Sequence, residues 1–389
     1  MTAELAERAA EHGRLAIDTE FVSERRYQAL LCLAQVAVPD PAAADGVRTD
    51  VLDPLTEELD TGPLAAVLAD PSVEVVMHAG RQDVGLLRRS WRTEVTNVFD
   101  TQVAAGFLGF GNQEGYESLV RKVLKLRLGG EEGFTKWDKR PLTEQQLEYA
   151  RDDARCLLAL GDALEERLRS NGRLDWAREE SGLLEGVSDE RGVERSYSRL
   201  PRVGRMDDES RAVARELVEW REALAEQMDR PPSFVLPDQA LVELARRRPS
   251  GRGALEHIRG LPPQTLHKRG DQLIGAIARG KQREPPPAPP EPPARDSRDA
   301  PVVSLAQALV RHRSMESGVA VELIATQSEL SALVAGLRRG RDDDSTRVTN
   351  GWRRELVGDE LRELLAGRRG LGVGPDGKLE VVSRQGQKD

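Results

Sequence analysis

A chain of 389 residues with 39% hydrophobic and 32% charged side chains is large enough for two or three cored domains, and it contains no apolar stretch near the ~20 residues of a membrane span. Its net charge of -9 argues against nucleic-acid binding on bulk charge alone, so the distribution of charge must decide that question. Five scattered histidines argue against a zinc site. Two cysteines outside any CxxC pair and an N-terminus without an apolar signal core predict a cytoplasmic protein.

Strand and helix patterns alternate in residues 1–185. The strand patterns fall at 14–21, 29–38, 48–53, 73–78 and 97–100. The helical patterns fall at 62–69, 80–90, 101–108, 116–127 and 143–169. Three consecutive strands followed by alternating helices and strands predict an α/β domain with a mixed sheet flanked by helices.

The rest of the chain divides into three segments after a polar, aperiodic boundary near 186–208. Residues 209–282 show short helical patterns with Pro or Gly turns and predict an all-helical domain. Residues 283–301 are rich in proline and predict an extended linker, which would let the last segment move. The start of residues 302–389 weakly repeats the helical domain, which predicts a diverged duplicate of it.

Two carboxylates follow the apolar run at 15–17. Asp18 and Glu20 are two residues apart, so on a strand both side chains project from the same face. Acids at strand ends are common, and the pair alone does not define a site. Two carboxylates at a buried strand nevertheless repel each other unless they are protonated or bind a cation.

Further acids occur later in the same domain. Asp83 opens a helical pattern directly after the apolar strand at 73–77. Tyr149 and Asp153 are i, i+4 neighbours on one helical face, and Asp152 at i+3 is nearly as well placed, so spacing does not choose between the two aspartates. Tyr149 and Asp153 share this helical face with apolar side chains, namely Cys156, Leu157 and Leu160. We therefore expect the face to lie toward the sheet.

The order of these residues resembles the DEDD exonuclease superfamily in its tyrosine-containing subgroup, most closely the ribonuclease D family. The resemblance rests on DTEFVSERRY (18–27), HAGRQD (78–83), FDTQVAAGFLG (99–109) and KRPLTEQQLEYARDD (139–153). It implies a ribonuclease-H-like exonuclease domain that holds two divalent metal ions, Mg²⁺ or Mn²⁺. It also implies the ligands, which are Asp18, Glu20, Asp83 and Asp153 in preference to Asp152. In the same family pattern, Tyr149 would orient the attacking water.

The resemblance extends to the helical segment. The stretches EWREALA (219–225) and RPPSFVLPDQAL (230–241) look like an HRDC domain, the helicase-and-ribonuclease-D C-terminal domain. Residues 302–389 then look like a degenerate second HRDC domain. The chain departs from the family before its RPL segment, where Lys136 replaces an acid and the loop at 128–136 is rich in glycine.

A positive region offers a way to bind a polyanion. Residues 242–283 contain ten Lys or Arg and three Asp or Glu, although a solvated helical surface is the simpler interpretation of any few of them. The predicted contacts from this region are Arg246, Arg247, Arg248, Arg252, Arg259, Lys268 and Arg269. Motif residues near the carboxylates complete the predicted nucleic-acid contacts, namely Phe21, Tyr27, Trp137 and Arg140. For Phe21, core packing is an equal alternative.

The resemblance therefore implies a metal-dependent 3′–5′ exoribonuclease that uses a two-metal mechanism. Nucleoside 5′-monophosphates would be the products, and transfer RNA and other structured RNAs the partners. A 3′–5′ DNA exonuclease is the alternative, because relatives that act on DNA use the same four acids. A non-catalytic nucleic-acid-binding scaffold is disfavoured by the five intact site residues. We expect a monomer that does not bind membranes.

Overall fold

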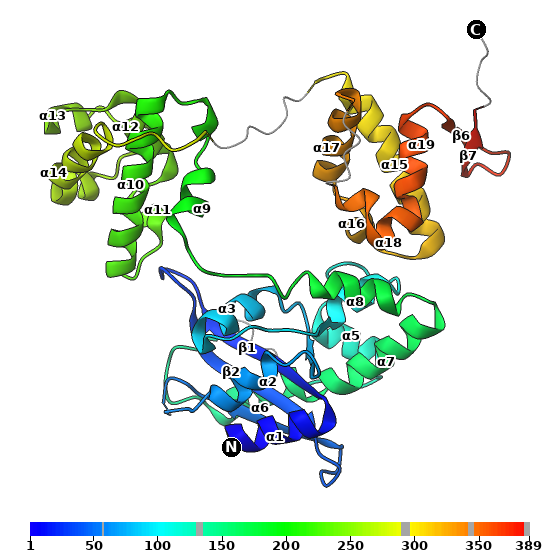
Figure 1. Ribbon diagram of the computed structural model, residues 1–389. Coiled ribbons are helices and arrows are strands. Elements are labelled where there is room, and N and C mark those ends of the chain that lie inside the picture. Colours follow the sequence, from blue (N-terminus) through cyan, green and yellow to red (C-terminus); the bar gives the residue numbers. More distant parts are fainter. Residues whose placement is uncertain (57, 130–134, 289–295, 341–345, 385–389) are drawn as a thin grey trace.

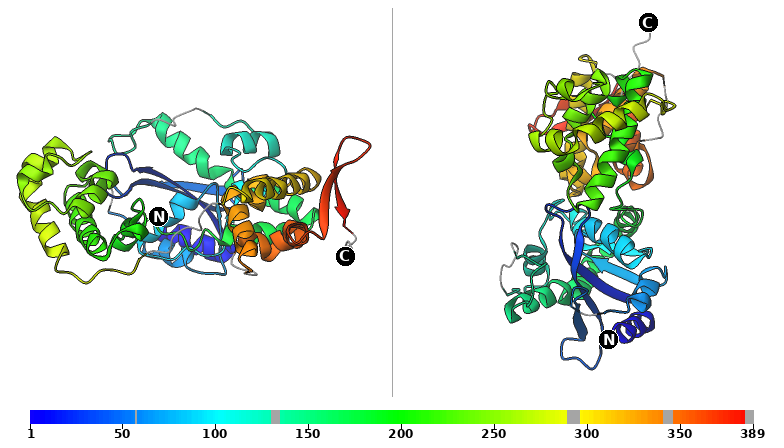
Figure 2. Two further views of the ribbon diagram at one scale, coloured as in Figure 1. Left: turned by 90° about the horizontal axis from the view of Figure 1, so that it is seen from above. Right: turned by 90° about the vertical axis from the view of Figure 1, so that its left-hand side faces the viewer.

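The computed structural model describes residues 1–56, 58–129, 135–288, 296–340 and 346–384 (Figure 1). An N-terminal sheet domain runs from α1 to α8, a middle helical domain from α9 to α14, and a C-terminal domain from α15 to β7. Figure 2 shows both helical domains on the same side of the sheet domain, over its opposite ends. No helix within the described ranges is long and apolar enough to cross a membrane.

Five strands form the sheet of the N-terminal domain, in the order β3-β2-β1-β4-β5. They are β1 (Arg14–Val22), β2 (Leu30–Pro39), β3 (Val47–Leu52), β4 (Glu74–Met77) and β5 (Val98–Asp100). The first three pair antiparallel, whereas β4 lies parallel to both β1 and β5. The predicted mixed sheet is therefore confirmed, with β1 at its centre.

Helices cover both faces of this sheet. The helices α1 (Thr2–His12), α2 (Gly62–Leu68) and α3 (Arg81–Trp91) pack through Leu5, Leu64 and Leu87 onto the apolar side chains of one face. The other face carries α6 (Glu144–Arg155) and α7 (Leu157–Ser170). The remaining helices of the domain are α4 (Thr101–Gly106), α5 (Tyr116–Val123) and α8 (Leu174–Gly182).

The single helix predicted at 143–169 is two helices. The α6 segment begins with a capping box, in which Thr143 and Gln146 bond each other's backbone N–H, as the sequence pattern indicates. It packs on β3, β2 and β1, whereas α7 packs mainly on α4 and β4 and less on β1 and β2. Because these surfaces lie at different places on the domain, the chain changes direction at Cys156.

The middle domain contains α9 (Val193–Ser198), η1 (Val203–Arg205), α10 (Asp208–Gln227), α11 (Pro232–Val235), α12 (Asp238–Arg247), α13 (Arg252–Leu255) and α14 (Pro263–Gly280). Its core includes Leu217, Leu241 and Leu273. The turn between β1 and β2 enters this core, where Tyr27 is 7% exposed and its hydroxyl donates to Glu222 at 3.1 Å. The predicted role of Tyr27 as a nucleic-acid contact is thus contradicted by burial, because its ring joins two domains instead.

The C-terminal domain contains α15 (Asp299–Ser317), α16 (Val321–Ile324), α17 (Gln327–Arg338), η2 (Arg347–Thr349), α18 (Gly351–Arg353), η3 (Arg354–Gly358), α19 (Asp359–Leu365) and a hairpin of β6 (Arg369–Val373) and β7 (Leu379–Ser383). The predicted linker at 283–301 ends earlier than expected, since α15 already begins at Asp299. Part of that linker, 289–295, lies outside the described residues.

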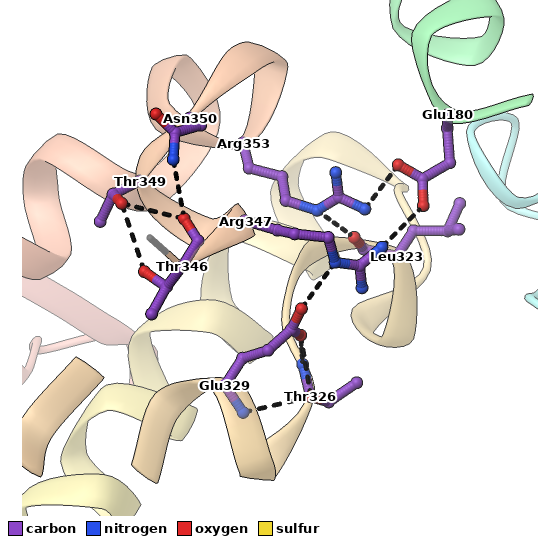
Figure 3. A network of polar contacts seen from close by, with 9 residues as sticks. All are labelled: Glu180, Leu323, Thr326, Glu329, Thr346, Arg347, Thr349, Asn350 and Arg353. Atoms are coloured by element: carbon purple, nitrogen blue, oxygen red, sulfur yellow. Dashed lines mark hydrogen bonds and ion pairs between the residues drawn. The ribbon is translucent and has the colours of Figure 1, made fainter. Parts of the chain in front are cut away.

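Aromatic rings attach the C-terminal domain to the sheet domain. Trp352 lies between Phe107 and Trp176, with ring centroids 4.8 and 5.5 Å apart. Next to it, the Arg353 guanidinium donates to the Glu180 carboxylate at 2.6 Å, and Arg347 bonds the same carboxylate at 3.2 Å (Figure 3). These contacts dock the C-terminal domain on the sheet domain in this structure, and the mobility expected from the Pro-rich linker stays a prediction.

Candidate active site at the end of the central strand

The two acids of the first motif lie where β1 approaches its C-terminal end. Asp18 and Glu20 face the side of the sheet on which α6 packs, while Ile17 and Phe21 contact the opposite core. Alternation along the strand therefore places both carboxylates on one face, as the i, i+2 spacing predicts. A β-bulge directly after Glu20 shifts the pairing with β2.

Two more carboxylates reach the same place from helices on either side. Asp83 is buried in the first turn of α3, which follows β4, the parallel neighbour of β1. The Thr19 hydroxyl on β1 donates a hydrogen bond to its carboxylate. Asp153 lies on α6, and the Tyr149 hydroxyl donates to it from one helical turn earlier.

The four carboxylates perturb one another electrostatically. Burial, followed by the charges of Asp83, Asp153 and Glu20, raises the pKa of Asp18 well above its ordinary value. Burial and the charges of Asp153 and Asp83 raise the pKa of Glu20 to about 8. Burial also raises the pKa of Asp83 to about 6 and that of Asp153 to about 7, against the lowering effect of their hydroxyl donors. Such shifts mark a site where negative charge is concentrated without compensation.

This donor set fits hard divalent cations. It consists of carboxylate oxygens, which Mg²⁺ and Mn²⁺ prefer, and a cation would offset the repulsion that raises the pKa values. Within the described residues, no three His, Cys, Asp or Glu side chains already converge closely enough to enclose a metal ion. The Thr19 and Tyr149 hydroxyls each bond one of the carboxylates, Asp83 and Asp153.

The geometry distinguishes the two aspartates that spacing could not. The charge of Asp153 raises the pKa of both Asp18 and Glu20, so its carboxylate faces them. The Asp152 carboxylate instead accepts from the Gly129 backbone N–H at 3.4 Å and lies 3.9 Å from Arg155. Asp153 is therefore the member of the cluster.

Tyr149 is supported by the segment that precedes its helix. The buried Trp137 ring stacks on it with centroids 6.1 Å apart. Arg140 holds that segment, because its guanidinium makes two 2.6 Å bonds to Asp53 and donates to the Trp137 carbonyl at 2.7 Å. The structure thus gives Trp137 and Arg140 internal contacts in place of the predicted nucleic-acid contacts. Lys136 is exposed, and the altered loop at 128–136 lies partly outside the described residues, at 130–134.

A cleft of about 790 Å³ opens beside the end of β1 and the start of α3. Its lining includes Phe21, Arg81, Gln82, Leu86 and Arg195. Phe21 is half-buried, because its ring packs against the core and also lines this cleft. The sequence patterns did not indicate Arg81 or Arg195, because neither belongs to a charge cluster.

The predicted basic cluster lies on the middle domain, and part of it is neutralised. Three of its arginines form ion pairs, namely Arg247 with Glu243, Arg248 with Asp207, and Arg252 with Asp271. Arg246, Arg259 and Lys268 are exposed. Arg269 lines a groove of about 540 Å³ with Trp220. The accessible positive charge is therefore smaller than the sequence count suggests.

A mixed sheet whose central strand carries two of four clustered carboxylates, with a tyrosine on the helix of the fourth, defines the class of 3′–5′ exonucleases. Residues 1–169 match the family described as 3′–5′ exonuclease, and residues 210–277 match the HRDC domain. The predicted exonuclease domain and one HRDC domain are thereby confirmed.

Relatives narrow this class to one family. The chain is 35% identical to a ribonuclease D of Nitrobacter hamburgensis over 98% of both chains, and 34% identical to one of Jannaschia sp. over 94% of this chain and 93% of that one. The crystal structure of Escherichia coli RNase D, titled an exoribonuclease involved in structured RNA processing, superimposes with a TM-score of 0.79 at 27% identity. The superposition covers 94% of this chain and 96% of that one. The chain belongs to the ribonuclease D family.

Proposed function

We propose that this protein is a metal-dependent 3′–5′ exoribonuclease that shortens transfer RNA precursors and other structured RNAs from their 3′ ends. The observation that carries the proposal is the group of four mutually perturbed carboxylates from β1, α3 and α6 beside the Tyr149 hydroxyl. The similarity of the whole chain to ribonuclease D proteins supports RNA as the substrate. The products would be nucleoside 5′-monophosphates.

Asp18, Glu20, Asp83 and Asp153 would hold two divalent ions, Mg²⁺ or Mn²⁺. When bound, such ions neutralise charge on a phosphodiester and activate a water molecule for in-line attack. The carboxylates bind the ions in their ionised form, so the raised pKa values disfavour binding at low pH. The ions and protons therefore compete for the same oxygens.

Tyr149 would orient the attacking water by hydrogen bonding. Burial and the charges of Asp153 and Glu20 raise its pKa above the ordinary value of 10, which keeps the hydroxyl protonated at neutral pH. A neutral phenol is a hydrogen-bond partner rather than a base. Trp137 fixes the ring on which this hydroxyl depends.

The strand of RNA would be held by cations around the site. Arg81 and Arg195 line the cleft beside the end of β1, and Phe21 in the same cleft offers an apolar edge to a terminal base. Arg259 and Lys268 on the middle domain would contact phosphates farther upstream.

In this proposal the domains span 1–185, 209–282 and 299–389, because α15 begins at Asp299, and the linker runs from 283 to 298. We also propose that the C-terminal domain is a diverged HRDC domain. In the middle domain and in the C-terminal domain alike, a long helix (α10, α15) precedes a four-residue helix (α11, α16). That short helix is followed by a residue in an extended conformation, Leu236 or Ala325. The next helix, α12 or α17, has 10 or 12 residues.

The test compares Asp18→Asn and Asp153→Asn with Asp152→Asn as the matched control, on a 5′-labelled RNA with a 3′ extension in Mg²⁺. The first two variants should lose stepwise shortening, whereas the control should retain it because Asp152 faces away from the cluster. Near-native rates in Asp153→Asn would refute the site. A DNA oligonucleotide of matched sequence tests the alternative, since faster release of deoxynucleotides would favour a DNA exonuclease.

We further propose a cytoplasmic monomer. Light scattering during gel filtration should give one 42.9 kDa species across a tenfold range of protein concentration. A mass that doubles with concentration would overturn this proposal.

A further inference from the structure

A fifth buried aspartate lies close to the four carboxylates but does not belong to them. Asp100 is the last residue of β5 and is 1% exposed. Its Oδ1 accepts from the backbone N–H groups of Ala79 at 3.2 Å, Gln102 at 2.8 Å and Val103 at 3.1 Å. Its Oδ2 accepts from the Gly80 N–H at 2.8 Å. The carboxylate thus satisfies four backbone donors from two separate segments.

The two pairs of bonds do different things. The bonds from Gln102 and Val103 cap the N-terminus of α4, a common role for aspartate. The bonds from Ala79 and Gly80 hold the turn between β4 and α3. Ordinary helix capping does not require this second pair, because the turn is remote in sequence from Asp100.

The turn at Ala79 and Gly80 needs such support. Ala79 has a φ of 53°, a left-handed conformation that costs a residue with a Cβ atom about 1 kcal/mol. Gly80 is the N-cap residue of α3 and has no side chain to cap that helix. A Cβ atom at Gly80 would lie 2.8 Å from the Met77 side chain, so only glycine fits there. Asp100 does not cap α3, but it accepts from the Ala79 and Gly80 N–H groups and so holds this turn from outside.

The turn leads directly into the candidate metal site. Asp83 is three residues beyond Gly80, in the first turn of α3, and its carboxylate accepts from the Thr19 hydroxyl of β1. The path of the chain from Gly80 therefore decides where this carboxylate points. Asp100 is itself fixed, since its backbone N–H donates to the buried Ser181 hydroxyl of α8 at 3.2 Å.

We propose that Asp100 is a positioning residue for the exonuclease reaction, which holds the start of α3 so that Asp83 meets Asp18 and Glu20 around the metal ions. This inference rests on the proposed function. Asp100 contacts neither substrate nor metal in this role. It acts through the Ala79 and Gly80 amides on Asp83, so losing it should weaken metal binding more than RNA binding.

Two substitutions separate positioning from charge and from capping. Asp100→Ser keeps a good N-cap for α4 but is too short to reach Ala79 and Gly80 as well. Asp100→Asn removes the same negative charge but keeps the length and one carbonyl acceptor. Asp207→Asn is the control, because Asp207 caps α10 through the Ser210 N–H in the middle domain, away from the site.

Mn²⁺ binding to the full chain, measured by calorimetry, is the first readout. Asp100→Ser should bind Mn²⁺ about 10-fold to 100-fold more weakly, the range for a residue that orients metal ligands, with Asp100→Asn between it and wild type. In cleavage assays at limiting Mn²⁺, kcat should fall while KM for RNA stays unchanged. Asp207→Asn should match wild type in both measurements. Equal losses in Asp100→Ser and Asp100→Asn would show a charge effect alone and would overturn the proposal, as would wild-type affinity in both.

Amide hydrogen exchange provides a second readout if Asp100→Ser does not fold. In Asp100→Asn, the peptide that spans 78–86 should exchange faster than in wild type, while peptides from β1 and β2 stay protected. Unchanged exchange in 78–86 would contradict the positioning role. The underlying function is tested separately: if Asp18→Asn still cleaves RNA and binds Mn²⁺ normally, the proposed site itself fails. If only the Asp100 variants behave as wild type, the site stands and this inference fails.

Discussion

In the absence of divalent cations, the free energy of unfolding of the sheet domain should decrease as the pH rises. The pKa of Glu20 is about 8 in the folded chain, against an ordinary value of 4.5 that applies when the chain is unfolded. Between these values the folded state binds the proton and the unfolded state does not. The free energy of unfolding therefore falls as pH increases through this window, and the stabilisation is fully present only below about pH 4.5.

The size of the effect follows from the separation of the two pKa values. One pKa unit corresponds to 1.36 kcal/mol, so Glu20 alone should lower the free energy of unfolding by roughly 3 kcal/mol between pH 5 and pH 8. Asp153 and Asp83 act in the same direction, with pKa values of about 7 and 6. Burial is the main cause of both shifts. The three contributions are not additive, because the charges of Asp153 and Asp83 are themselves part of the cause of the Glu20 shift.

Urea unfolding in EDTA at half-unit steps from pH 5 to pH 8.5 measures this slope. Tryptophan fluorescence follows the sheet domain through Trp91, Trp137 and Trp176 when Trp220 and Trp352 of the other domains are replaced by phenylalanine. Addition of Mn²⁺ at about 100 times its dissociation constant should restore about 2.7 kcal/mol at pH 8 and much less at pH 5, where protons occupy the site. Glu20→Gln should flatten the slope in EDTA. A stability that does not change between pH 5 and pH 8 in EDTA, or the same slope in Glu20→Gln, would refute the reasoning.

Three further changes test other parts of the molecule. Tyr149→Phe should lower kcat about 10-fold to 100-fold with little change in Mn²⁺ affinity. It should also move the acidic limb of the pH–rate profile to higher pH, because Asp153 loses a hydrogen bond that lowers its pKa. An unshifted limb in single-turnover assays would contradict this. Arg353→Met leaves the buried Glu180 with fewer donors and should cost about 3 kcal/mol, seen as a lower urea midpoint and faster proteolysis near the linker. Replacing Arg259 and Lys268 by alanine should reduce the salt slope of RNA binding by about one for each residue, and an unaltered slope would remove them from the RNA path.

The parts of the fold that the sequence predicted are those that local spacing encodes. Alternation placed Asp18 and Glu20 on one face of β1, and a capping box marked the start of α6 correctly. The sequence patterns do not predict the first helix, α1, although Leu5 and Ala9 occur at helical spacing, because a short segment without a preceding cap residue gives a weak signal. Its end is marked by Gly13 in a left-handed conformation, a signal that was available.

Residues whose partners are distant in sequence were placed less well. Tyr27, Trp137 and Arg140 lie in motif segments, and this suggested contact with substrate. In the structure Tyr27 joins the middle domain, while the other two brace Tyr149. Proximity to a motif cannot distinguish a side chain that touches the substrate from one that supports the residue touching it, because both depend on the same three-dimensional neighbourhood. The same limit applies to Asp100, whose capping role is local but whose bonds to the turn before α3 are not.

The contacts of the C-terminal domain bear on how the candidate site is held. Arg353 bonds Glu180, and the next residue of α8, Ser181, accepts from the Asp100 backbone. The docked domain thus packs against the same helix that fixes the end of β5, and its aromatic contacts cover Phe107 after α4. A chain that ends before residue 299 would therefore leave an apolar surface exposed and Glu180 buried without its arginines, beside the strand end that carries Asp100. We expect such a truncation to weaken Mn²⁺ binding as well as stability, whereas a domain that only contacts RNA would leave Mn²⁺ binding unchanged when removed.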